Sequence, residues 1–112
     1  MNYRKDFPYA DLIGLEIQSI ESGMSICTIP FKNDLLNPND VVHGGVVYSL
    51  ADTGMGAAVF STLEDGEFCA TLEIKIMYLK AAGHFDLICH TQVIKKGRRV
   101  AFLESEILSN KE

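Results

Sequence analysis

The chain has 112 residues, 47% of them hydrophobic and 22% charged, which predicts one globular domain spanning residues 1–112 rather than a disordered segment. Fifteen acidic against ten basic residues give a formal net charge of −5, which argues against nucleic acid and anionic membranes as partners. Three widely spaced cysteines without a Cys-x-x-Cys pair favour reduced thiols over a disulfide framework or a zinc site. With no apolar run near residue 1, we expect a cytoplasmic protein.

The first third of the chain predicts a β-hairpin followed by a loop. Residues 12–20 alternate imperfectly between apolar and polar side chains, and residues 24–31 are rich in β-forming residues. The turn formers Glu21-Ser22-Gly23 separate these two runs and predict the hairpin turn. Residues 32–42 are dense in Asn, Asp and Pro, which predicts a loop.

The centre of the chain predicts one long buried helix. His43-Gly44-Gly45 opens an apolar run over residues 46–63 in which Asp52 is the one charged residue, so a membrane span is excluded. Gly54 and Gly56 each weaken such a helix by about 1 kcal/mol relative to Ala, which suggests close approach of another backbone. Because this helix has no polar face, it must be covered on every side.

Three more strands follow the helix, over residues 67–80, 84–95 and 99–108, joined by short turns. The resulting order, β-β-α-β-β-β, predicts an α+β fold in which an antiparallel sheet wraps around one long central helix.

The start of the predicted helix carries the chemistry. Gly44-Gly45 leaves backbone N–H groups accessible, and the helix dipole makes them a site for a polarised carbonyl oxygen. Asp52 needs a partner, a solvent-filled cleft or a function, because burying an unpaired carboxylate is costly. Gly44 and Asp52 lie about 12 Å apart along one helix, so one carbonyl cannot contact both. A reaction that uses both groups therefore requires two protomers related by a two-fold axis.

Several segments together resemble the hotdog-fold acyl-CoA thioesterases of the phenylacetate-degradation (PaaI) type, relatives of 4-hydroxybenzoyl-CoA thioesterase. The likeness covers about residues 12 to 108. The segments that carry it are Asn37, His43-Gly44-Gly45, Leu50-Ala51-Asp52-Thr53, Tyr78 and Lys96-Gly97-Arg98-Arg99. The resemblance implies a hotdog fold in which the family's final strand, expected beside residues 67–80, has no counterpart in this sequence.

The resemblance also implies roles for individual residues. Asp52 would be the catalytic carboxylate, as nucleophile or as general base for water, and the Gly44 N–H would polarise the thioester carbonyl. His43 would position the thioester, and Asn37 would orient the attacking water. The implied substrate-binding residues are Gly45, Tyr48, Ser49, Thr71 and, for the phosphates of coenzyme A, the basic turn of Lys96, Gly97, Arg98 and Arg99.

The implied activity is hydrolysis of an acyl-CoA or aryl-CoA thioester to a carboxylic acid and free coenzyme A, by a homodimer or a homotetramer. The resemblance implies no metal and no cofactor besides the coenzyme A that the substrate carries. Each residue also has a structural explanation: His43 could cap the helix, Asp52 could be a satisfied buried carboxylate, and basic turns are commonly only solvated. Two functional alternatives stay open, a non-catalytic module that binds acyl-CoA or another small ligand, and a hotdog dehydratase or hydratase.

Overall fold

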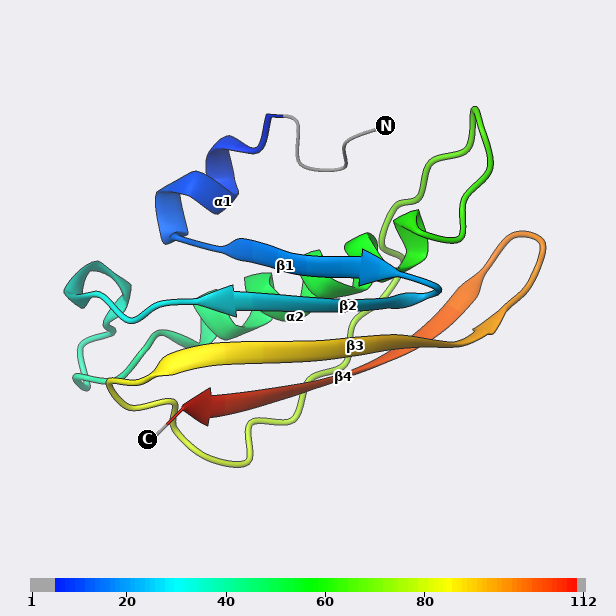
Figure 1. Ribbon diagram of the computed structural model, residues 1–112. Coiled ribbons are helices and arrows are strands. Elements are labelled where there is room, and N and C mark those ends of the chain that lie inside the picture. The colour runs from blue at the N-terminus through cyan, green and yellow to red at the C-terminus, as the bar shows by residue number, and fades with distance from the viewer. Residues whose placement is uncertain (1–5, 111–112) are drawn as a thin grey trace.

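The computed structural model describes residues 6–110, in which an antiparallel sheet lies against one long helix (Figure 1). The sheet has the strand order β1-β2-β3-β4, and every neighbouring pair is antiparallel. This arrangement confirms the predicted α+β class. The elements are α1 (Pro8–Ile13), β1 (Glu16–Glu21), β2 (Met24–Ile29), the 3-10 helix η1 (Asn33–Leu35), α2 (Gly44–Phe60), β3 (Asp86–Lys96) and β4 (Ala101–Asn110).

The core lies between α2 and the inner face of the sheet. Alternate residues of β2 and β3 are buried there, with Cys27 opposite Cys89 in the strand register and both thiols free. At Gly54 of α2, a Cβ would lie 2.8 Å from Thr91 Oγ1 and 3.3 Å from Cys89 Sγ. Gly54 therefore permits the close approach of helix and sheet that the interior glycines suggested.

Burial also controls the chemistry of the core cysteines. Burial, and then the neighbouring Cys89, raise the pKa of the Cys27 thiol from 9.0 to about 11, against the opposing effect of a hydrogen bond with Ser25. Burial likewise raises the pKa of Cys89. Both groups therefore stay protonated at neutral pH and pack as small apolar side chains.

The N-terminal part of the predicted strand 12–20 is helical instead. Pro8 occupies the first turn of α1, where its missing N–H has no intrahelical role. Gly14 ends the helix in the left-handed conformation, with φ of +79°, and its N–H donates to the carbonyl of Ala10. The strand β1 therefore begins only at Glu16, and Leu12 and Ile13 belong to α1.

Residues 67–80, predicted as a strand, are extended but pair with no strand among the described residues. The segment runs back along α2 instead, because Thr71 bonds to Asp52 and Tyr78 bonds to Gly44 at the helix start. Its alternating pattern is that of a strand, but no neighbouring strand supplies backbone partners. The predicted order β-β-α-β-β-β is therefore wrong at this position, and β4 is the edge of the described sheet.

The remaining boundaries agree with the predictions to within three residues. The helix predicted over residues 46–63, opened by residues 43–45, is α2, and the last two predicted strands are β3 and β4. Within residues 6–110, no helix combines the length and the apolar character needed to cross a membrane.

Candidate active site

The first turn of α2 presents one unpaired backbone donor. His43 is the N-cap of α2, and its Nδ1 accepts a hydrogen bond of 2.7 Å from the Gly45 N–H. A ring nitrogen that accepts carries no proton, so the neutral imidazole keeps its hydrogen on Nε2. The Gly44 N–H, as the first of the helix, has no intrahelical acceptor, and no other described residue accepts from it. Gly44, rather than Gly45, therefore supplies the accessible amide.

The loop before α2 brings Asn37 to the same end of the helix. Its side-chain oxygen accepts from the N–H of Asn39 at 2.9 Å and of Val41 at 3.3 Å, so it closes the loop. The His43 N–H in turn donates to the carbonyl of Leu35 at 2.8 Å. Because the oxygen of the Asn37 amide is used within the loop, its NH2 group is what could donate to a bound water.

A hydrogen bond from a residue outside α2 orients the Asp52 carboxylate. The Thr71 hydroxyl donates a hydrogen bond of 2.7 Å to Asp52 Oδ1, and Asp52 itself is half-buried. The second carboxylate oxygen stays available for another partner or for a reaction. Eight residues at about 100° each place Asp52 about 80° around α2 from Gly44. Both positions contact the segment after the helix, Asp52 through Thr71 and the Gly44 carbonyl through Tyr78.

Helix α2 also carries Tyr48 and Ser49. Tyr48 is exposed, and the Ser49 hydroxyl donates to the carbonyl of Gly45 at 2.9 Å. The structure thus brings six predicted site residues together on or beside α2, and Thr71 completes the group. The six are His43, Gly44, Gly45, Tyr48, Ser49 and Asp52.

The comparisons with known proteins fit this geometry. The model of the thioesterase superfamily matches residues 39–112, a span that contains His43, Gly44, Asp52 and Thr71 but not Asn37. The chain belongs to the thioesterase superfamily. Within this superfamily the antiparallel sheet against one long helix is the hotdog fold. Conserved protein PA5202 from Pseudomonas aeruginosa is a solved neighbour, with a TM-score of 0.91, 31% identity, and coverage of 99% of this chain and 90% of that one.

Two further thioesterases are similar over most of the chain. Acyl-coenzyme A thioesterase PaaI from Escherichia coli is 27% identical over 104 residues, which cover 92% of this chain and 72% of PaaI. A hypothetical thioesterase from Streptococcus pneumoniae, solved with coenzyme A, has a TM-score of 0.77 and 28% identity, covering 87% of this chain and 74% of that one. The chain spans 62% and 66% of the length of two Saccharolobus solfataricus relatives named as candidate esterases.

The basic turn of residues 96–99 lies away from the other predicted site residues. It forms the tip of the β3–β4 hairpin, where the Gly97 N–H donates to the carbonyl of Val100 at 2.8 Å. In Figure 1 this tip lies near the C-terminal end of α2, whereas His43 and Gly44 lie at the opposite end. Within one protomer, therefore, Lys96, Arg98 and Arg99 do not join the site at the start of α2.

Two residues at the candidate site were not assigned a role from the sequence. The Tyr78 hydroxyl donates to the Gly44 carbonyl at 2.8 Å, which places its ring beside the helix start. Burial and then the charge of Asp52 raise the pKa of the Cys69 thiol, so Cys69 stays a neutral thiol beside the carboxylate. Tyr78 was noted in the sequence only as part of the family resemblance, and Cys69 was not noted as a site residue, because each lies far in the sequence from the residue that it contacts.

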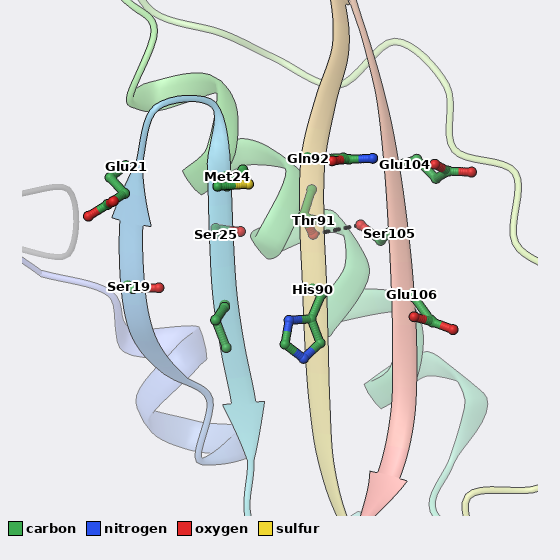
Figure 2. Close-up of a pocket in the computed structure, with 11 residues that line it drawn as sticks. Ser19, Glu21, Met24, Ser25, His90, Thr91, Gln92, Glu104, Ser105 and Glu106 are labelled. Atoms are coloured by element: carbon green, nitrogen blue, oxygen red, sulfur yellow. Dashed lines mark hydrogen bonds between the residues drawn. The ribbon is translucent and has the colours of Figure 1, made fainter.

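A separate hollow lies on the outer face of the sheet. Figure 2 shows it on the face turned away from α2, lined by His90 of β3, Glu21 of β1, and Glu104 and Glu106 of β4. It has a volume of about 840 Å³ and contains none of the predicted site residues. Among the described residues, no group of three His, Cys, Asp or Glu side chains is placed to hold a metal ion.

Proposed function

We propose that this protein hydrolyses acyl-CoA or aryl-CoA thioesters to a carboxylic acid and free coenzyme A. Membership of the thioesterase superfamily and the likeness to the PaaI acyl-coenzyme A thioesterase support this reaction class. The observation that carries the proposal is the unpaired Gly44 N–H at the start of α2, with the Asp52 carboxylate eight residues further along the same helix.

The donor and the carboxylate act on one substrate only if they come from two protomers. Both groups lie in α2, eight residues and about 12 Å apart along its axis. We therefore propose a homodimer in which the Gly44 N–H of one protomer faces the Asp52 carboxylate of its partner. A homotetramer would be a pair of such dimers.

Exposed apolar side chains support this dimer. Four of them belong to residues 67–80, the segment that contacts Asp52 through Thr71. Their exposed fractions are 88% for Phe68, 81% for Leu72, 79% for Met77 and 82% for Leu79. On α2 itself only Gly45 and Tyr48 are exposed, and the residues of its outer side are otherwise half-buried, although the helix is apolar nearly all round. Exposed apolar surface of this kind marks an interaction site, and here it borders both halves of the candidate site.

The chemistry follows from the two groups. The Gly44 N–H, helped by the helix dipole, binds the carbonyl oxygen and stabilises the negative charge that develops on it. Asp52 of the partner either attacks the carbonyl carbon, giving an anhydride that water opens, or removes a proton from water as water attacks. In both routes the carbon–sulfur bond breaks, the sulfur leaves as coenzyme A, and one water molecule is consumed.

The remaining residues bind and orient the substrate in this proposal. The Asn37 NH2 group donates to the attacking water, His43 Nε2–H faces the thioester, and the acyl group lies along Gly45, Tyr48 and Ser49. Residues 96–99 contact the phosphates of coenzyme A from the partner protomer, since an antiparallel pair brings the hairpin tip of one chain toward the helix start of the other. A related thioesterase structure contains coenzyme A, which supports this ligand. Coenzyme A is part of the substrate, and we propose no other cofactor.

The test is release of free thiol from acetyl-CoA, hexanoyl-CoA and benzoyl-CoA by the wild type and by Asp52→Asn and Asp52→Ala. We expect turnover of at least one thioester and a loss of about 1000-fold or more in both variants. No thiol release above background from any of the three would refute the proposal. Saturable binding without turnover would favour a non-catalytic binding module, and hydration of an enoyl thioester would favour a hydratase.

A single turnover in ¹⁸O-labelled water separates the two routes. If Asp52 is the nucleophile and water opens the anhydride at the aspartyl carbonyl, ¹⁸O enters the Asp52 carboxylate. If Asp52 is a general base, the label enters only the released acid.

A further inference from the structure

Tyr9 of α1 contacts the side of α2 that carries the candidate site. Its hydroxyl lies 2.8 Å from Ser49 Oγ, and the Ser49 hydroxyl donates its one proton to the carbonyl of Gly45. Tyr9 is therefore the donor in the contact with Ser49. A chain of hydrogen bonds runs from Tyr9 through Ser49 to the first turn of α2, beside the Gly44 N–H.

The Tyr9 side chain lies beside Ser49 on α2, near the carboxylate of the candidate site. Ser49 precedes Asp52 by three residues, so the two side chains lie about 60° apart around the helix axis. Tyr9 reaches this side from α1, while the segment containing Thr71 and Tyr78 reaches it from the other direction. The ring is 48% exposed, so part of its apolar surface is free to contact a ligand.

Anchoring of α1 does not depend on Tyr9. Ala10 and Ile13 of the same helix are buried in the core, with exposed fractions of 0% and 8%. The Leu15 N–H also donates to the carbonyl of Ala10 at 2.8 Å, which fixes the end of the helix. The packing of α1 therefore does not require the half-exposed Tyr9 side chain, whose hydroxyl bonds to the candidate site.

We infer that Tyr9 is a specificity-determining residue whose ring forms the wall of the acyl-binding groove on the Ser49 side. This inference rests on the proposed thioesterase function. The acyl chain of a thioester whose carbonyl oxygen binds at Gly44 passes over Ser49 and packs against the ring. A two-carbon acyl group is too short to reach the ring, whereas a six-carbon chain contacts it.

The experiment measures binding of two non-hydrolysable thioethers, S-hexyl-CoA and S-ethyl-CoA, by titration calorimetry. We expect Tyr9→Ala to raise Kd for S-hexyl-CoA about tenfold and to change Kd for S-ethyl-CoA less than twofold. Tyr9→Phe keeps the ring and should keep the wild-type ratio of the two affinities. Leu12→Ala is the matched control, because Leu12 lies on the same helix and is 70% exposed. Should Tyr9→Ala fail to fold, Tyr9→Leu should show an intermediate rise for S-hexyl-CoA alone.

The outcomes separate this inference from the proposed function. Equal changes for both thioethers, an unchanged ratio in Tyr9→Ala, or the same shift in Leu12→Ala would overturn the role of Tyr9, as would the absence of binding of either thioether. If the thioethers show the expected pattern while no thioester is hydrolysed, the proposed hydrolysis fails and the assignment of Tyr9 to the acyl groove stands.

Discussion

Replacing Gly44 with proline should remove the N–H that we propose polarises the substrate carbonyl, and should leave the helix intact. Proline is favoured at the first position of a helix, where its missing N–H breaks no intrahelical bond. The residue before proline must be extended, and His43 already has φ of −61° and ψ of 138°. The Gly45 N–H that bonds to His43 is unaffected. The structure therefore permits Gly44→Pro, which deletes the proposed donor.

The expected effect is large. Loss of one such donor raises the barrier to acyl transfer by about 3–4 kcal/mol, which lowers kcat about 100- to 1000-fold. The matched control is Gly44→Ala, which keeps the N–H. Its Cβ would lie 3.4 Å from the Tyr78 ring, an ordinary van der Waals contact, so we expect kcat within about threefold of the wild type.

The assay is thiol release at saturating acyl-CoA, with thermal unfolding to compare the folding of the two variants. Both variants should unfold within a few degrees of the wild type, because neither disturbs a buried contact. A proline variant as active as the alanine variant would show that the Gly44 N–H takes no part in the reaction.

Three other predictions test the neighbouring structure. Thr71→Val should lower kcat about tenfold in steady-state assays with little change in KM, because Asp52 loses its orienting hydroxyl, whereas Thr71→Ser should stay near the wild type; equal activity of Val and Ser would contradict this role. Gly54→Ala should lower the free energy of unfolding in urea by about 1–2 kcal/mol, since its Cβ would lie 2.8 Å from Thr91 Oγ1, and adding Thr91→Ala should recover part of the loss; a variant as stable as the wild type would refute the clash. The folded-state pKa of Cys27 lies above its ordinary value of 9.0, at about 11. The contribution of Cys27 to the free energy of unfolding is therefore complete below pH 9 and is lost as pH rises toward 11. Urea midpoints should fall less steeply over this range in Cys27→Ala than in the wild type, and an equal fall would contradict the assignment.

The sequence predicted the elements that local pattern and composition determine. The apolar run after His43-Gly44-Gly45 predicts α2, and the alternation over residues 84–95 and 99–108 predicts β3 and β4, because each pattern matches the burial of its own element. Local pattern does not determine whether an alternating segment finds a partner strand. Residues 67–80 have the alternation of a strand but lie along α2 without one. Helix α1 was missed because its six residues are too few to show a helical period.

The candidate site likewise has one part that the sequence predicts and one part that only the structure shows. The start of α2 and Asp52 were visible because they lie in one helix at a fixed rise per residue. The contacts that complete the site join residues distant in the sequence, with Thr71 nineteen residues from Asp52 and Tyr9 forty residues from Ser49. The resemblance to the thioesterases suggested Thr71. No sequence pattern signals Tyr9, because only the fold brings it to Ser49.

A mixing experiment tests most directly whether two protomers share one site. Gly44→Pro and Asp52→Asn are each expected to be inactive as homodimers, since every site lacks either the donor or the carboxylate. In a refolded equal mixture, about half of the dimers contain one chain of each kind, and each of these has one complete site of two. The thiol-release assay should therefore recover about one quarter of the wild-type activity. Activity no higher than that of the separate variants would contradict a site built from the Gly44 N–H of one protomer and the Asp52 carboxylate of the other.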